Sequence, residues 1–147
     1  GFNSKMNDME ASLGLEGIND FWFTFLTRKS SWRRLVKFTE KYQDKAMFSY
    51  ERTGTEVCPH GFSILLKGSV STRKLCETLE KYNIHWKRNF GCIPTQHEAY
   101  FHLNHKTGDF PNSEYIGDYG IHIGVHQYLT NEDLIRIETA LKEYFES

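Results

Sequence analysis

The sequence of 147 residues has little cysteine and no long apolar run. Its three cysteines, Cys58, Cys76 and Cys92, are odd in number and far apart, which fits neither a disulfide framework nor a CxxC metal site. No stretch approaches the roughly 18 uninterrupted apolar residues of a membrane span. The opening GFNSKMNDME also lacks the basic start and apolar stretch of a signal peptide. We therefore expect reduced thiols in a cytoplasmic protein without a membrane segment.

The chain also lacks an excess of charge of either sign. Lys and Arg number 18 against 19 Asp and Glu, which gives a formal net charge of −1. Binding to a phosphate backbone needs a surplus of Lys and Arg, so we expect no nucleic-acid partner. With 39% hydrophobic residues the chain should fold, and its length suggests a single domain over 1–147. Because it does not begin with methionine, we expect a fragment or a processed product.

Motifs for metal or catalytic chemistry are missing as well. Seven histidines are present, but a zinc site needs three or four ligands at short spacing, such as HExxH on a helix, and no such spacing occurs. The sequence contains no P-loop, GxGxxG or GxSxG motif. We therefore expect no metal site. His126 and Gln127, at the end of a predicted strand, are the most reasonable place for a site.

What the chain does have is hydrophobic periodicity. Asn7 or Asp8 can cap a short helix that Gly14 and Gly17 would interrupt. From about residue 20 to residue 42, apolar residues recur at spacings of three and four, which predicts a long helix. Its many aromatic side chains exceed what a lone small domain can cover, so we expect an exposed apolar surface along 21–35 and self-association.

The later elements alternate between strands and helices. Strands are predicted at 61–67, 84–87 and 120–126. Helices should begin at Ser71 or Thr72 and at Thr130, and 89–112 should be mainly loop with a short helix near 97–103. The sequence therefore predicts an α+β fold: a small, mainly antiparallel sheet covered by helices on one face and preceded by a long N-terminal helix.

Two segments resemble a known family. The opening GFNSKMNDMEASLGLEGI resembles the GYN-x-(R/K)-M-x-(D/E)-x-(Q/E)-A-x-x-G-L-x-Q-L stretch of the DegT/StrS nucleotide-sugar aminotransferases. The closing GDFPNSEYIGDYGIHIGVHQYLTNEDLIRIETALKEYF is similar to the family's last region. There an FP-x-(A/S)-E stretch precedes a short strand, an H-(P/Q)-x-L-(T/S) element and a final helix. The resemblance runs from residue 1 to about residue 145.

The resemblance implies the fold of the aspartate aminotransferase superfamily and pyridoxal phosphate (PLP) as cofactor. In the family, a large N-terminal domain carries the lysine that forms a Schiff base with PLP, or a histidine in the sugar 3-dehydratase branch. A small C-terminal α+β domain covers the site. This chain looks like that C-terminal domain, so the large domain would be absent and 1–147 would hold no catalytic residue. Without the Schiff-base amine, the chain alone should not be active.

The resemblance also implies roles for four residues. Asn3 matches an asparagine that reaches across the dimer to the PLP phosphate, and Lys5 matches a basic residue near the substrate. His126 and Gln127 would line the sugar side. The implied partners are a nucleotide-linked 4-keto-6-deoxy sugar and a second copy of the chain in a homodimer.

Two alternatives stay open from the sequence. The G-x-x-x-G-x-H-Q pattern at 120–127 is closer to the 3-dehydratase branch, whereas IPTQHEAY at 93–100 is closer to the aminotransferase branch. A catalytically silent module that kept the fold for binding or dimerisation is the second alternative. A Lys or His at the Schiff-base position, upstream of Gly1, would distinguish an enzyme from such a module.

Overall fold

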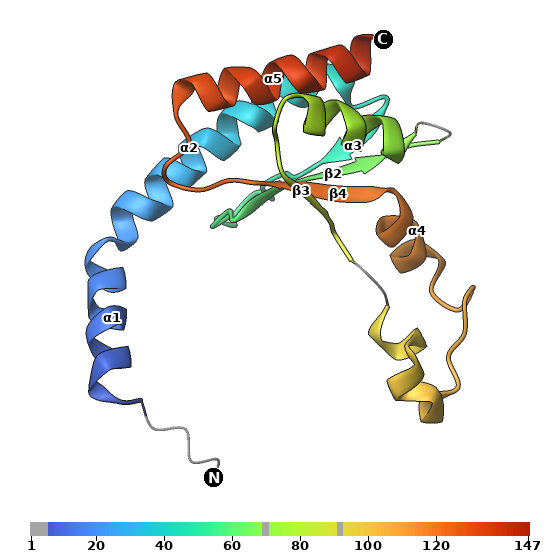
Figure 1. The fold of residues 1–147 in the computed structure, drawn as a ribbon, viewed down its shortest axis with the longest axis horizontal. Coiled ribbons are helices and arrows are strands. Elements are labelled where there is room, and N and C mark those ends of the chain that lie inside the picture. Colours follow the sequence, from blue (N-terminus) through green and yellow to red (C-terminus); the bar gives the residue numbers. More distant parts are fainter. Residues whose placement is uncertain (1–5, 69–70, 91–92) are drawn as a thin grey trace.

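The computed structural model describes residues 6–68, 71–90 and 93–147 (Figure 1). The elements in chain order are α1 (Asp8–Asn19), α2 (Phe21–Thr39), a 3₁₀ turn η1 (Glu40–Tyr42), β1 (Ala46–Phe48), β2 (Gly61–Leu66), α3 (Thr72–Lys81), β3 (Trp86–Arg88), two further 3₁₀ turns η2 (Pro94–Gln96) and η3 (Glu98–Leu103), α4 (Pro111–Tyr119), β4 (Gly120–Gly124) and α5 (Asn131–Glu146).

The four strands form one sheet in the order β1–β2–β4–β3, and every neighbouring pair is antiparallel. Between β2 and β4, Phe62 pairs with Ile123 and Ser63 pairs with His122. Since side chains alternate along a strand, Phe62 and Ile123 point to one face of the sheet while Ser63 and His122 point to the other. The predicted α+β class with a mainly antiparallel sheet is confirmed.

In the described part of the chain, three helices cover one face of this sheet. Figure 1 shows α2, α3 and α5 on the same side, with α4 at one end of the strands. The covered face carries a continuous apolar layer. Its fully buried side chains come from both the strands and the helices: Leu35, Phe62, Ile64, Leu66, Leu75, Leu79, Ile121, Ile123, Leu141 and Phe145. We call the other side, with Met47, Ser63, Leu65 and His122, the open face.

Short-range signals fix the ends of the helices. The Ser71 side chain accepts a hydrogen bond from the backbone of Lys74 at the start of α3, and Thr130 forms a capping box with Asp133 at the start of α5. Asn83 takes the left-handed conformation (φ 54°) after α3. The starts of α3 and α5 are as the sequence predicts.

A polar contact joins α2 to α5 beside the apolar layer. Arg34 donates from Nε and Nη2 to the two carboxylate oxygens of Glu138, at 2.6 and 2.9 Å, and from Nη1 to Oδ1 of Asn131 at 2.6 Å. A bidentate pair of this kind attracts the two side chains and also holds them in a defined relative orientation. It therefore sets the position of α2 relative to α5.

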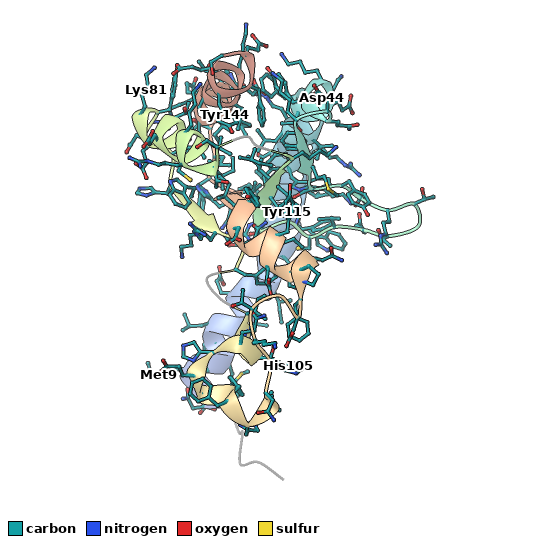
Figure 2. All side chains as sticks on the ribbon, turned by 90° about the vertical axis from the view of Figure 1, so that its right-hand side faces the viewer. Met9, Asp44, Lys81, His105, Tyr115 and Tyr144 are labelled. Carbon is teal, nitrogen blue, oxygen red and sulfur yellow. The ribbon has the colours of Figure 1, made fainter. Side chains whose placement is uncertain are left out.

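The N-terminal helix α1 has no buried residue. Asn7 and Glu10 form a capping box, and the helix runs through Gly14 and Gly17, so the predicted interruption at these glycines is wrong. In Figures 1 and 2, α1 extends away from the sheet and its helices. The helical structure of α1 therefore depends on its N-terminal cap and on its continuity with α2.

The predicted apolar surface along α2 is only partly confirmed. Phe21, Trp22 and Leu26 are exposed, Trp22 to 65%. Trp32 and Leu35 are instead buried in the core, because the second half of α2 packs over the sheet and against α5. The exposed surface continues instead onto α1, through Met9, Leu13, Leu15 and Ile18.

Some elements differ from the prediction. The three-residue β1 was not predicted, and neither was α4, which begins at Pro111 inside the expected loop. β3 starts at Trp86 rather than at residue 84. The expected short helix near 97–103 is present as a 3₁₀ helix. Both missed elements are short, and neither has a full apolar face that would produce a periodic signal.

We expect Phe62→Ala to lower the free energy of unfolding by about 3–5 kcal/mol, since it leaves a cavity between the sheet and the helices. The matched control is Phe101→Ala in η3, where the side chain is 71% exposed and the loss should stay below about 0.5 kcal/mol. Urea unfolding monitored by circular dichroism measures both. Equal losses in the two variants would contradict the assignment of the core.

Candidate functional site

Of the four residues singled out by the sequence, the structure describes His126 and Gln127. Asn3 and Lys5 lie outside the described residues. His126 is exposed and, with Asn83 and Arg136, lines a hollow of about 270 Å³. The Gln127 side chain points elsewhere, since its Oε1 accepts a hydrogen bond from Nε of Arg28 at 3.0 Å. The structure thus separates the side chains of His126 and Gln127.

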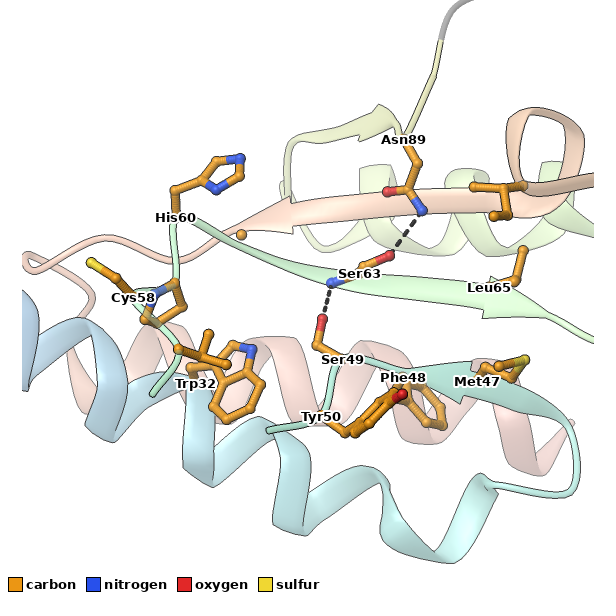
Figure 3. Close-up of a pocket in the computed structure, with 14 residues that line it drawn as sticks. Trp32, Met47, Phe48, Ser49, Tyr50, Cys58, His60, Ser63, Leu65 and Asn89 are labelled. Atoms are coloured by element: carbon orange, nitrogen blue, oxygen red, sulfur yellow. Dashed lines mark hydrogen bonds between the residues drawn. The ribbon is translucent and has the colours of Figure 1, made fainter. Parts of the chain in front are cut away.

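A larger hollow lies on the open face of the sheet (Figure 3). Its volume is about 450 Å³. The side chains of Ser63 and Leu65 lie along β2, with Cys58 and His60 toward one end and Asn89 on the opposite side from Trp32. Ile116 of α4 also lines the hollow. Because these residues come from distant segments, spacing along the sequence could not reveal the hollow.

Three polar side chains form a short ladder across this hollow. Ser49 Oγ accepts from the backbone N–H of Ser63 at 2.8 Å, and Nδ2 of Asn89 donates to Ser63 Oγ at 2.8 Å (Figure 3). The backbone N–H of Asn89 in turn donates to the carbonyl of Gly120. The orientation of the Asn89 amide is therefore fixed, and its oxygen remains an acceptor.

The glycine at the start of β4 makes room for this ladder. A Cβ atom at Gly120 would lie 2.4 Å from the carbonyl oxygen of Ile116 and 2.6 Å from Nδ2 of Asn89. Both distances are shorter than any van der Waals contact allows. Gly120 is thus needed for the close approach of α4 and Asn89 to the strand.

Two histidines lie at one edge of the ladder. His60 and His122 have ring centroids 6.1 Å apart, and both line a second hollow of about 360 Å³ that shares His60, Ser63 and Asn89 with the first. Burial lowers the pKa of His122 from its ordinary value of 6.5, and the nearby His60 and Lys87 lower it further. These contacts therefore favour the neutral form of His122.

One wall of the larger hollow is tied to α2 by a buried lysine. Lys29 is only 5% exposed, and its Nζ lies 2.7 Å from a carboxylate oxygen of Glu56 and 2.9 Å from one of Glu51. The hydrogen bond to Glu56 raises the pKa of Lys29, and Glu51 adds to this. The backbone N–H of Val57 lowers the pKa of Glu51, as does Lys29. These contacts hold the segment 51–57 in place.

The carboxylate of Glu114 holds together the segment 94–110, which precedes α4. This residue is the glutamate of the FP-x-(A/S)-E stretch, and its Oε1 accepts from Nε2 of Gln96 at 2.6 Å and from the backbone of Gly108 at 2.8 Å. The Gln96 bond lowers the pKa of Glu114, and the Gly108 and Phe110 N–H groups add to this. The carboxylate thus connects η2, the turn at 106–109 and α4.

The described lining of the two hollows on the open face holds no Asp or Glu side chain. No group of three side chains that could hold a metal ion is found in the described part of the chain. Within the same ranges, no helix is long and apolar enough to cross a membrane. The open face offers hydrogen bonding from amide, hydroxyl and imidazole groups above apolar side chains, with the ammonium group of Lys87 on the same face as His122.

Comparisons with known proteins identify relatives of this fold. DesV of S. venezuelae superposes with a TM-score of 0.89 at 15% identity over 100% of this chain and 38% of that chain. The PLP form of Spr1654 from Streptococcus pneumoniae, described as a sugar aminotransferase, gives 0.81 at 21% identity, covering 97% of this chain and 36% of that one. A mutant of the GDP-4-keto-6-deoxymannose-3-dehydratase ColD with bound GDP-perosamine gives 0.77 at 20% identity, covering 97% and 37%.

The sheet with three helices on one face is thus an α+β domain of the aminotransferase-like class. A model of the DegT/DnrJ/EryC1/StrS aminotransferase family matches residues 1–142, and the chain belongs to this family. It spans less than two fifths of the length of the solved structures that it matches. A search of curated proteins found no match.

We expect the His122 imidazole to titrate at lower pH in the folded chain than in the urea-unfolded chain, because burial and His60 disfavour its charged form. Since the folded chain then binds fewer protons, the free energy of unfolding should fall as the pH drops below about 6.5. NMR titration of the ring resonances measures the shift, and His122→Asn should remove this part of the pH dependence. A pKa equal to or above the unfolded value would contradict the burial.

Proposed function

We propose that this chain is the C-terminal small domain of a PLP-dependent enzyme that acts on a nucleotide-linked 4-keto-6-deoxy sugar, by transamination or 3-dehydration. The observation that carries the proposal is the family match over residues 1–142. Two of its structural relatives support the chemistry, since one is a PLP form and the other holds a nucleotide-linked sugar. The enzyme would work in the cytoplasm.

The buried lysine of the described chain, Lys29, does not fit the role of covalent PLP attachment. A lysine that forms a Schiff base must lose its proton, whereas Lys29, the buried one, is paired with two carboxylates and has a raised pKa. When bound, PLP supplies an electron sink for carbanion chemistry. In this proposal the attachment residue comes from outside 1–147.

The contribution proposed for this chain is binding. Asn3 would donate to the PLP phosphate across a dimer, and Lys5 would lie near the substrate, where an amide and an ammonium suit anionic oxygens. His126 and Gln127 would line the sugar side. Arg28 donates a hydrogen bond to the amide oxygen of Gln127. For Gln127 to contact a sugar, this oxygen must accept a second hydrogen bond or the bond to Arg28 must break.

We further propose that the exposed surface of α1 and the start of α2 mediates contact with a second copy of the chain. Met9, Leu13, Ile18, Trp22 and Leu26 are all more than half exposed. Apolar patches of this kind usually mark interfaces rather than free surface.

Mixing the purified 147-residue chain with PLP should give no stable absorption band of a lysine-bound cofactor, and borohydride should fix no PLP on the chain. Absorption spectra and intact mass measure both. A longer chain that includes the upstream region should show the band if it is an aminotransferase. It should bind PLP without the band if it is a histidine-type dehydratase. Stoichiometric reduction onto one lysine of the 147-residue chain would overturn the proposal.

In that longer protein, Asn3→Ala should weaken PLP retention by removing a donor to the phosphate, by about tenfold for one charge-assisted hydrogen bond. Asn112→Ala, an exposed asparagine on α4, is the matched control and should retain PLP normally. Cofactor occupancy after dialysis gives the comparison. Unchanged occupancy in Asn3→Ala would remove Asn3 from the cofactor site.

Sedimentation velocity should show that the chain self-associates as its concentration rises. The double variant Trp22→Ala/Leu26→Ala should weaken this association, because it removes exposed apolar area from the start of α2. The control is Phe101→Ala, which removes an exposed ring from η3. A monomer at the highest soluble concentration would rule out the proposed contact.

A further inference from the structure

We propose that His60 and His122, at one edge of the open face, bind a divalent transition-metal ion of the zinc and copper class between their imidazole rings. The two residues lie far apart in the sequence, so the spacing of histidines along the chain, which predicts no metal site, gives no sign of this pair. Such a site is independent of the proposed function, because it involves neither PLP nor any residue outside the described ranges.

The two rings are close enough to share one ion. Their centroids are 6.1 Å apart and their planes are inclined at 59°. A bond from zinc to an imidazole nitrogen is roughly 2.0–2.1 Å long, which places the centroids of two rings on one ion about 5–6.5 Å apart. The observed separation falls within this range. Figure 3 shows the His60 ring projecting from the start of β2, and because this side chain is exposed, it can turn toward the ion without loss of packing.

The glycine that follows His60 lets the two rings approach each other. A Cβ atom at Gly61 would lie 3.2 Å from Cδ2 and 3.8 Å from Cβ of His122, so the His122 side chain lies over this glycine. The backbone of His60 is fixed as well, because its carbonyl accepts a hydrogen bond from the N–H of Val125, just after β4, at 3.2 Å. Strand pairing therefore positions both ligands in advance, which reduces the entropy lost on binding.

The side chains around the two rings select the kind of metal. Both rings line the hollow of about 360 Å³, whose described lining also contains the side-chain oxygens of Ser63 and Asn89 but no Asp or Glu. Magnesium and calcium prefer oxygen ligands that include carboxylates, whereas imidazole suits zinc, copper and nickel. Water completes the shell of the ion. Because the protein supplies two ligands, where a structural zinc site has four, binding should be weak and reversible.

Lys87 limits the affinity of this site. It pairs with His122 between β3 and β4, so both side chains lie on the open face. Its ammonium group repels a divalent cation, although the exposed side chain can turn this charge into solvent. Removing the charge should therefore tighten the binding of a metal ion. The same change would weaken the binding of an anion, so a variant at Lys87 distinguishes the two kinds of ligand.

The test is a titration of the 147-residue chain with zinc chloride, followed through the NMR resonances of the histidine rings at about pH 7.5, where most imidazole is neutral. We expect saturable shifts at His60 and His122, and none with magnesium chloride. His122→Asn should raise the dissociation constant for zinc at least about tenfold, since even the outer-shell partners of a metal contribute roughly 10–100-fold. The matched control is His102→Asn, which alters an exposed histidine on η3 and should leave the constant unchanged.

Two further variants sharpen the test. Should His122→Asn unfold, His60→Asn replaces it, because this variant alters an exposed side chain and keeps the backbone carbonyl that accepts from Val125. It should weaken zinc binding to the same extent. Lys87→Gln should lower the dissociation constant about threefold by removing a repelling charge. A higher constant in Lys87→Gln would contradict a cation site.

The proposal is overturned if zinc shifts the two rings no more than it shifts the ring of His102, or if His60→Asn and His122→Asn both keep the affinity of the unaltered chain. Sodium phosphate, in a separate titration, is the competing probe. Saturable shifts of the two rings with phosphate, and none with zinc, would identify an anion site and overturn the proposal as well.

Discussion

The structure depends on one apolar layer, formed where the sheet meets helices on a single side. Phe62, Ile64, Ile121 and Ile123 are wholly buried there because β2 and β4 pair in the register that aligns their apolar positions. A shift by one residue would turn every one of these side chains to the open face. The register that creates the core therefore also places Ser63 and His122 opposite it, which is how packing determines the candidate site.

The elements that the sequence predicts best are those whose apolar stripe lies in this layer. α5 is an example, since Leu134, Ile137, Leu141 and Phe145 recur at helical spacing and are buried together. The sequence also predicts its capping residue, Thr130. β1 and α4 are not predicted because both are short, and α4 has no buried residue that would produce a periodic apolar pattern. The interruption expected at Gly14 fails because a glycine lowers helix stability without ending the helix.

The candidate site was much less predictable than the fold. Asn89 and Ser63 meet through a hydrogen bond between residues 26 positions apart, and no spacing rule connects them. Their contact requires a glycine at position 120, because a Cβ atom there would clash with the Asn89 amide. Gln127 illustrates the converse. Its place beside His126 in the sequence suggested a shared role, but the turn directs its amide to Arg28 on α2.

The sheet with α2, α3 and α5 should behave as one cooperative unit, to which α1 contributes no buried residue. Native-state hydrogen exchange, at a concentration where the chain is monomeric, tests it most directly. Amides of β2, β4 and α5 should exchange only through global unfolding. The α1 helix has no buried residue, and a 12-residue helix without tertiary contacts is marginally stable in water. The protection factors of its amides should therefore be at least about 100-fold lower than those of β2. Protection of α1 equal to that of β2 would contradict the account.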